Sequence, residues 1–200
     1  MKPLQLSFSK SAALYEQLPP DKGNEVVIIG YSNVGKSSLI NKICNHKGMA
    51  KTSRTPGRTQ LLNVFEHDEN SRLIDAPGYG FARVSAATRA NWKAQLANYL
   101  SERQCLKGII IVIDIRRGLR EIDQMVINWS NQNDLPILLV LNKSDKISRA
   151  QQAKQALAIK QGTEHCTDRS IITSSCLKST GMPLIIDQLQ QWLTQHKKHT

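Results

Sequence analysis

The stretch that decides the fold reads Gly30-Tyr31-Ser32-Asn33-Val34-Gly35-Lys36-Ser37-Ser38-Leu39. It follows the apolar run Val26–Ile29 and leads into a helical pattern that starts at Lys36. Glycine at both ends of the turn lets backbone N–H groups converge on one point, and the N-terminus of the following helix adds positive potential there. Gly-x4-Gly-Lys-Ser between a strand and a helix is the pattern of a phosphate-binding loop. The sequence therefore predicts a nucleotide site at residues 30–38.

Every position of this loop is expected to contact the nucleotide. Lys36 places a mobile ammonium group between the β- and γ-phosphates, and the Ser37 hydroxyl is expected to be a ligand for Mg²⁺. We assign nucleotide contacts to Gly30, Tyr31, Ser32, Asn33, Val34, Gly35, Lys36, Ser37 and Ser38. The alternative is an incidental glycine-containing turn, and the strand before it and the helix after it argue against that alternative.

Apolar runs and helical patterns alternate along the rest of the chain. The apolar runs are residues 26–29, 109–115, 137–141 and 171–173, and the helical patterns that follow them are residues 36–45, 121–131, 149–160 and 184–195. Strands that are apolar throughout and alternate with helices indicate a parallel sheet covered on both faces. We therefore expect an α/β protein with the three-layer fold of a P-loop NTPase, with helices on both faces of a mostly parallel sheet.

One section breaks this alternation. Residues 61–66 and 72–74 are strand-like and are separated by a turn-rich segment. This arrangement predicts a hairpin, and therefore one antiparallel edge strand in the sheet. The next helix is expected at residues 86–101.

The N-terminal residues differ from the rest of the chain. Leu4, Leu6 and Phe8 alternate with polar residues, which predicts a short edge strand. The segment ends in a turn rich in proline and glycine. We therefore divide the chain into an N-terminal extension, residues 1–22, and the main α/β domain, residues 23–200, on which the extension packs.

A second motif follows the apolar run 137–141, where the end of a parallel strand would place it near the phosphate loop. It consists of Asn142, Lys143, Ser144 and Asp145. The Asp145 carboxylate can accept from both N1–H and the 2-amino group of guanine, and adenine has neither donor. Asn142 can brace the loop and the N7 side of the base, and the stem of Lys143 can lie along the ring. The motif therefore favours a guanine nucleotide, GTP or GDP.

Two further groups lie at strand ends. The first directly follows Ile74 and reads Asp75-Ala76-Pro77-Gly78. Asp75 can hold Mg²⁺ through water and the N–H of Gly78 can reach the γ-phosphate, so this loop would differ between the GTP and GDP states. The second ends the run 171–173, can present N–H groups to guanine O6, and comprises Ser174, Ser175 and Cys176.

The segment from Lys47 to Thr59 is a long polar loop rich in threonine and positive charge. We assign Thr59 as the hydroxyl that completes the Mg²⁺ shell when GTP is bound, with Thr55 and Thr52 as the alternatives. Its neighbours are also expected to contact the nucleotide, and they are Gly57, Arg58, Gln60 and Leu61.

Composition limits the class of protein. The chain has 200 residues, of which 40% are hydrophobic and 22% charged, as in a globular domain. Its longest apolar runs are far below the roughly 20 residues that cross a bilayer, and residues 1–10 do not resemble a signal peptide, so a cytoplasmic location is expected.

Four cysteines lack the spacing of a disulfide framework or a zinc site. The net charge of +11 favours a polyanionic partner, with a merely basic soluble surface as the alternative.

Four segments together resemble one family. They are GYSNVGKSSLIN (residues 30–41), TPGRTQLLNVF (55–65), LIDAPGYGFA (73–82) and SCLKSTG (175–181). They are similar to the translation-factor class of P-loop GTPases, and most closely to the bacterial EngB (YihA/YsxC) ribosome-biogenesis GTPases, over essentially the whole chain. The sequence departs at Tyr31, where such proteins more often carry Arg, at Ala76, where Leu is usual, and at Asn142, where Thr is common. None of these departures removes a ligand group.

The resemblance implies a GTPase that acts as a switch. It implies binding to the large ribosomal subunit precursor, through rRNA and ribosomal proteins, a requirement for normal cell division and septation, and a monomer. Tyr79 stands where Ras-like enzymes carry the glutamine that orients water, so a low intrinsic rate is expected. Asn33 matches an asparagine that helps similar GTPases to bind K⁺, which predicts faster hydrolysis in K⁺ than in Na⁺. We assign catalysis to Lys36, Asn33, Thr59 and Gly78.

Two other functions stay open at this point. One is a P-loop ATPase or kinase that acts on a small molecule, and the other is a membrane-associated division GTPase whose basic surface meets anionic lipid. For the GTPase switch, a phosphate-backbone contact surface is expected near the nucleotide, with a solvated charged rim as the alternative. Its residues are Lys47, Lys51, Arg54, Arg58, Arg116, Arg117 and Arg120.

Overall fold

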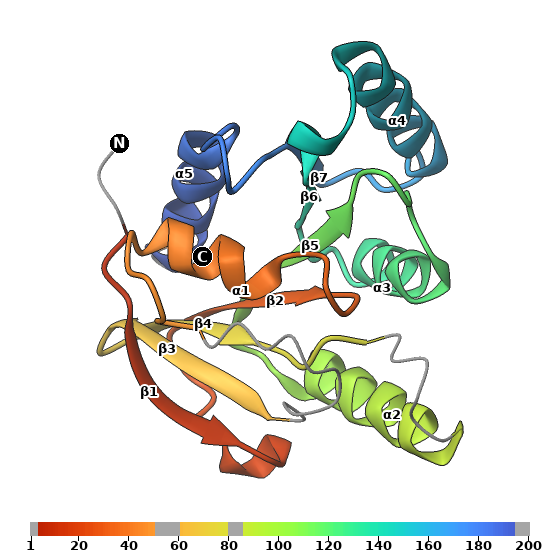
Figure 1. The fold of residues 1–200 in the computed structure, drawn as a ribbon. Coiled ribbons are helices and arrows are strands. Elements are labelled where there is room, and N and C mark those ends of the chain that lie inside the picture. Colours follow the sequence, from red (N-terminus) through yellow and green to blue (C-terminus); the bar gives the residue numbers. More distant parts are fainter. Residues whose placement is uncertain (1–3, 51–60, 80–85, 195–200) are drawn as a thin grey trace.

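The computed structural model describes residues 4–50, 61–79 and 86–194, with the backbone alone for residues 86–93. In these residues seven strands form one sheet, in the order β1-β3-β4-β2-β5-β6-β7 (Figure 1). The strands are β1 (Ser7–Ala12), β2 (Asn24–Gly30), β3 (Leu62–Asp68), β4 (Ser71–Asp75), β5 (Leu106–Asp114), β6 (Ile137–Asn142) and β7 (Arg169–Thr173). β3 is antiparallel to β1 and β4, and the other neighbours are parallel. The predicted mostly parallel sheet with an antiparallel edge is confirmed.

Helices cover both faces of this sheet, which confirms the three-layer α/β fold. They are α1 (Lys36–Ile43), α2 (Ala86–Glu102), α3 (Glu121–Gln132), α4 (Arg149–Gly162) and α5 (Met182–Leu193), with short 3-10 turns η1 (Tyr15–Gln17) and η2 (Ser144–Lys146). Residues of α1 and α5 pack with Val26 and Ile28 on one face, and residues of α2, α3 and α4 pack with Val27 and Ile29 on the other (Figure 1). Because alternate residues of β2 belong to two cores, the run Val26–Ile29 within it is apolar throughout.

The N-terminal strand lies later in the chain than its apolar alternation predicts. Leu4 and Leu6 are buried ahead of the strand, whereas Phe8, inside it, is 52% exposed. Backbone pairing with β3 forms this strand, and two serine side chains reinforce it: Ser9 donates to Glu66 and Ser11 to Asn63, each at 2.7 Å. β1 is therefore the outermost strand, and the antiparallel β3 is second from the edge.

A buried cluster of charges joins the N-terminal residues to the sheet at the end opposite the phosphate loop. Glu25 accepts hydrogen bonds from Arg72 Nε at 2.7 Å, from Arg103 Nη2 at 2.8 Å and from the Tyr99 hydroxyl at 2.8 Å. Burial alone would raise the pKa of Glu25, but the guanidinium groups of Arg103 and Arg72 hold it below its usual value. The same two groups donate to the carbonyl oxygens of Pro19, Pro20 and Lys22.

Tyr99→Phe is expected to lower the free energy of unfolding by about 1.5 to 3 kcal/mol, because the buried Glu25 carboxylate loses a donor that water cannot replace. Urea denaturation measures the change. Ser101→Ala on the same helix is the matched control, since its exposed hydroxyl bonds only locally to the Asn98 carbonyl. Equal stability of the Tyr99 and Ser101 variants would contradict this role of the phenol.

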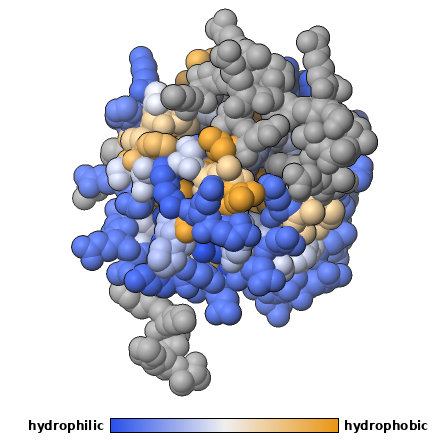
Figure 2. Space-filling model, turned by 90° about the horizontal axis from the view of Figure 1, so that it is seen from below, coloured by the Kyte–Doolittle hydropathy of each residue, from blue (hydrophilic) through white to orange (hydrophobic). Residues whose placement is uncertain are grey.

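The described part of the face in Figure 2 is largely polar. On the face of Figure 2, hydrophilic residues predominate among those described, and hydrophobic residues are visible in a few small areas. No helix within residues 4–50, 61–79 and 86–194 is both long and apolar enough to cross a membrane. A surface of this kind offers polar and charged groups to a partner over most of the described part of this face.

Candidate nucleotide-binding site

The predicted phosphate loop lies between β2, which ends at Gly30, and α1, which begins at Lys36 (Figure 1). β2 has β4 on one side and β5 on the other. After β2 the chain adds β3 and β4 on one side of this strand and then crosses to add β5 on the other side, and open α/β sheets bind ligands where the strand order reverses in this way. Val34 anchors the loop in the core, whereas Asn33 is exposed and Ser37 is half-buried. The strand, loop and helix stand in the arrangement that the sequence predicts.

Asn142 and Gly35 join the phosphate loop to the expected guanine loop. The Asn142 Nδ2 atom donates to the Val34 carbonyl oxygen at 2.9 Å. Gly35 has a φ of +100°, and a Cβ atom there would lie 2.4 Å from the same Nδ2 atom. Glycine is therefore required at this position both for its conformation and for the close approach of Asn142.

Gly35→Ala is expected to lower the free energy of unfolding by about 2 to 4 kcal/mol, because left-handed backbone strain adds to a clash with Asn142. GDP binding is expected to weaken as the two loops separate. Gly48→Ala is the matched control, since Gly48 has a φ of +91° but a Cβ there meets no atom within 4 Å. Urea denaturation and GDP titration of both variants make the comparison. An equal cost at the two positions would show that Asn142 does not require a glycine.

Asp114 is a site residue that the motifs do not reveal. The Lys143 ammonium group donates to the Asn33 carbonyl oxygen and lies 3.1 Å from Asp114 Oδ2. Asp114 also accepts from Arg116 Nε at 2.9 Å and Nη2 at 2.7 Å. Burial opposes ionisation, but hydrogen bonds from Arg116 and Lys143 hold the pKa of Asp114 well below its ordinary value. Asp114 pairs in register with Asn142, so the argument from strand ends could have found it.

The expected base-binding residues meet at the ends of β6 and β7. Asp145 Oδ1 accepts a hydrogen bond from Ser175 Oγ at 2.6 Å, and this bond, opposed by partial burial, lowers the pKa of Asp145. The Ser144 N–H donates to the Ser174 carbonyl oxygen at 3.0 Å. Cys176 Sγ lies 3.5 Å from Asn142 Oδ1. The structure therefore brings residues 142–145 and 174–176 together.

Asp75, Ala76, Pro77 and Gly78 lie against the phosphate loop. The Lys36 ammonium group forms an ion pair with Asp75 Oδ1, the Ala76 N–H donates to the Ile28 carbonyl oxygen, and a Cβ atom on Gly78 would lie 3.3 Å from Ser32 Cα. No cluster of three or more His, Cys, Asp or Glu in the described part of the chain could hold a metal ion alone. The hydroxyl of Ser37 and the carboxylate of Asp75 are hard oxygen donors, which fit Mg²⁺ when phosphate oxygens and water supply the other ligands.

Some predicted residues fall outside the described ranges. They are Gly57, Arg58, Thr59 and Gln60, together with the alternatives Thr52 and Thr55 and the basic residues Lys51 and Arg54. Leu61 is described, directly ahead of β3, and is exposed.

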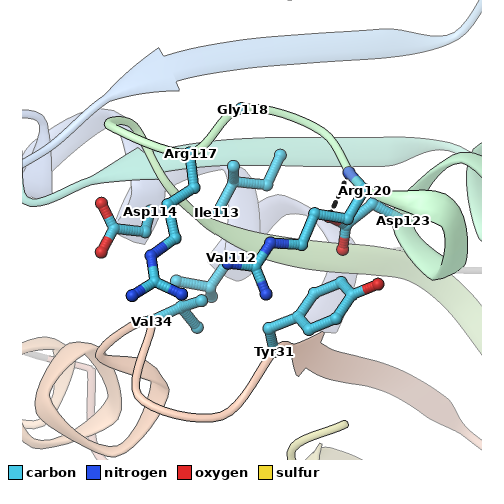
Figure 3. Close-up of a pocket in the computed structure, with 9 residues that line it drawn as sticks. All are labelled: Tyr31, Val34, Val112, Ile113, Asp114, Arg117, Gly118, Arg120 and Asp123. Carbon is cyan, nitrogen blue, oxygen red and sulfur yellow. Dashed lines mark hydrogen bonds between the residues drawn. The ribbon is translucent and has the colours of Figure 1, made fainter. Parts of the chain in front are cut away.

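The segment between β5 and α3 borders the phosphate loop in a shallow pocket. Figure 3 shows Tyr31 and Val34 of the loop facing Arg117 and Arg120 across this pocket. The Arg120 guanidinium carbon lies 4.4 Å from the centre of the Tyr31 ring, a cation–π arrangement. Two of the predicted basic residues are therefore close to the phosphate loop.

The sequence is similar to those of known GTP-binding proteins. The model of the family described as "50S ribosome-binding GTPase" matches residues 25–143. A probable GTP-binding protein EngB of Colwellia psychrerythraea (strain 34H / ATCC BAA-681) is 45% identical over 190 residues, which cover 94% of this chain and 85% of the relative. One of Enterobacter sp. (strain 638) is 42% identical over 189 residues, covering 94% and 91%.

Solved structures share the fold. The crystal structure of a probable GTP-binding protein EngB has a TM-score of 0.68 at 20% identity and covers 84% of this chain and 98% of its own. Era in complex with MgGDPNP and nucleotides 1506–1542 of 16S ribosomal RNA has a TM-score of 0.64 at 24% identity, covering 90% and 59%. These structures show the fold, whereas the family match and the identity to the curated relatives show the family. The chain belongs to the EngB family of GTP-binding proteins, within the 50S ribosome-binding GTPases.

Proposed function

We propose that this protein is a molecular switch that binds GTP and slowly hydrolyses it to GDP and phosphate. One observation carries the proposal: the Asn142 amide donates to the Val34 carbonyl oxygen at 2.9 Å and so fixes the guanine loop to the phosphate loop. Because Asp145 then stands at a set distance from the phosphate loop, the site fits a base and a phosphate chain joined in one guanosine nucleotide.

Each part of the site takes one part of this ligand. The N–H groups of residues 30–38 bind the phosphates, Asp145 reads the base, and residues 174–176 meet guanine O6. Ser37, Thr59 and, through water, Asp75 hold Mg²⁺, which neutralises phosphate charge when bound. Lys36 exchanges its ion pair with Asp75 for the phosphates, and Gly78 donates to the γ-phosphate. Residues 57–61 complete the site in the GTP state.

Asn33 is proposed to contribute to a K⁺ site beside the phosphates. Its side chain is exposed at the tip of the loop, and its carbonyl oxygen accepts from Lys143. A monovalent cation there would neutralise charge that develops in the transition state. Single-turnover hydrolysis with saturating Mg²⁺ tests this proposal, and equal rates in K⁺ and Na⁺ would remove it.

We further propose that the switch acts in the cytoplasm as a monomer, in assembly of the large ribosomal subunit, and that normal cell division and septation depend on it. The net charge of +11 and the position of Arg117 and Arg120 beside the phosphate loop, with Arg116 bound to Asp114, support an rRNA contact that changes with the bound nucleotide. Residues 1–22 are proposed as an extension of the G domain at residues 23–200, since β1 pairs with β3.

Two measurements test the function. Titration with fluorescent GDP and ADP is expected to show a preference for GDP of about 10⁴-fold, and similar affinities would favour an ATPase or kinase. Sedimentation with large ribosomal subunits is then compared with flotation on anionic liposomes at the same salt concentration. Binding to the subunits with a non-hydrolysable GTP analogue, and not with GDP, supports the ribosomal role, whereas binding to liposomes alone would favour a membrane-associated GTPase.

A further inference from the structure

Tyr79, which follows Gly78, is held at both ends. Its N–H donates to the Gly30 carbonyl oxygen at 3.2 Å, and its own carbonyl oxygen accepts from the Ser32 N–H at 2.7 Å and the Ser32 hydroxyl at 3.0 Å. Its side chain is 2% exposed, and its hydroxyl donates to Asp123 Oδ1 of α3 at 2.5 Å. The backbone of this residue is therefore fixed to the phosphate loop and its side chain to a helix on the other side of the pocket.

The phenol ring also contacts the phosphate loop. The rings of Tyr31 and Tyr79 meet edge to face with centres 4.4 Å apart, and Arg120 covers the Tyr31 ring. The Tyr79 hydroxyl is buried and donates to Asp123, so it is not available to orient a water molecule at the phosphate loop. Tyr79 therefore serves here as an anchor and does not replace the water-orienting glutamine.

Asp123 is a buried carboxylate with two distinct partners. Oδ2 accepts from the Arg120 N–H at 3.0 Å at the start of α3, the bond dashed in Figure 3, and Oδ1 accepts from Tyr79. The first contact is that of a helix-capping residue, and the second is not needed for capping. Burial raises the pKa of Asp123 to about 6. Hydrogen bonds from the Tyr79 hydroxyl and the Arg120 N–H, and the charge of the Arg120 guanidinium group, lower this pKa but do not offset the effect of burial. The side chain is thus ionised at pH 7.5 and can only accept, so Tyr79 must donate.

We propose that Asp123 is a positioning residue for GTP hydrolysis, which holds Tyr79 by its hydroxyl and thereby fixes the N–H of Gly78 where the γ-phosphate must be bound. The inference rests on the proposed function, because it takes the site to be one for GTP. GDP has no γ-phosphate, so the tether matters for GTP and its hydrolysis and not for GDP.

The test compares Tyr79→Phe, Asp123→Ala and the double variant with the unaltered protein. Tyr79→Phe removes the tether and keeps both the buried ring and the helix cap. It is expected to slow single-turnover GTP hydrolysis about tenfold and to leave the Kd for GDP within about twofold. Asp123→Ala removes the acceptor together with the helix cap, so it is expected to slow hydrolysis at least as much. The double variant is expected to be no slower than Asp123→Ala alone, because both changes remove the same contact with Tyr79.

Ser130→Ala is the matched control. Its buried hydroxyl donates to the Leu135 carbonyl oxygen near the far end of α3, so the variant weakens the same helix without touching Tyr79. Hydrolysis at the unaltered rate in Tyr79→Phe, or an equal loss in Ser130→Ala, would overturn the inference while GDP binding still supported the proposed function. Failure of the unaltered protein to bind GDP would overturn both.

Discussion

Replacement of Lys36 by methionine is expected to weaken GTP binding by about 10²- to 10⁴-fold. An ammonium group between the β- and γ-phosphates makes two charge-assisted hydrogen bonds, each worth about 1.5 to 3 kcal/mol, which together give about 3 to 6 kcal/mol. In the structure this group is held by Asp75, and its side chain is only 11% exposed. Methionine keeps the apolar stem in place but cannot donate. Titration with a fluorescent, non-hydrolysable GTP analogue measures the loss.

The control must separate binding from folding, because the variant leaves Asp75 without its ammonium partner. Lys154→Met, on the exposed face of α4, makes the same chemical change away from the site and is expected to keep the GTP affinity within about twofold. Urea denaturation is run on both variants. A folded Lys36 variant that binds GTP as tightly as the unaltered protein would place the phosphate site elsewhere.

The fold could be predicted well because its units are local. The apolar runs in β2, β5 and β6 are buried on both faces, the run in the edge strand β7 is mostly half-buried, and a helix is the next long element after each of them. Short apolar runs that alternate with helical patterns therefore predict the type and order of these elements. The bounds of the N-terminal strand were harder to predict from the sequence. Its register depends on partners in β3 such as Glu66 and Asn63, more than 50 residues away, and not on its own alternation.

The site residues could be predicted from the sequence where a known motif follows a strand. Contacts between side chains of different helices and loops could not be predicted in this way. Asn142 and Asp145 stand at a strand end in a known pattern, and the structure joins both to neighbouring loops. The bond between Tyr79 and Asp123 spans 44 residues and involves a common residue type in the first turn of a helix, where an acidic residue is ordinary. Nothing in the spacing distinguishes Asp123 from such a residue, so only the packed structure identifies the contact.

Asp145→Asn is expected to weaken GDP binding by about 10⁴-fold and to make xanthosine diphosphate the better ligand. In the proposed site the carboxylate accepts from two guanine donors, and an amide would turn one acceptor into a donor that faces N1–H or the 2-amino group. A buried polar pair mismatched in this way costs about 10⁴-fold or more. Xanthine carries a carbonyl oxygen where guanine has its amino group, so it offers the acceptor that the amide needs. Competition of GDP and xanthosine diphosphate against a fluorescent analogue measures the change.

The structure indicates that Asp145→Asn changes the contacts to the base without changing the conformation of the loop. The asparagine Oδ1 can still accept from Ser175, which lies 2.6 Å from Asp145 Oδ1, so the loop is expected to keep its shape. Because that bond lowers the pKa of Asp145, the unaltered carboxylate is ionised from pH 5 to 8, and its own titration does not alter GDP affinity over this range. Asp134→Asn, on the exposed turn after α3, makes the same charge change away from the site. If the Asp145 variant kept its preference for GDP, the base would be read by other residues, and the bracing of residues 142–145 against the phosphate loop would be structural alone.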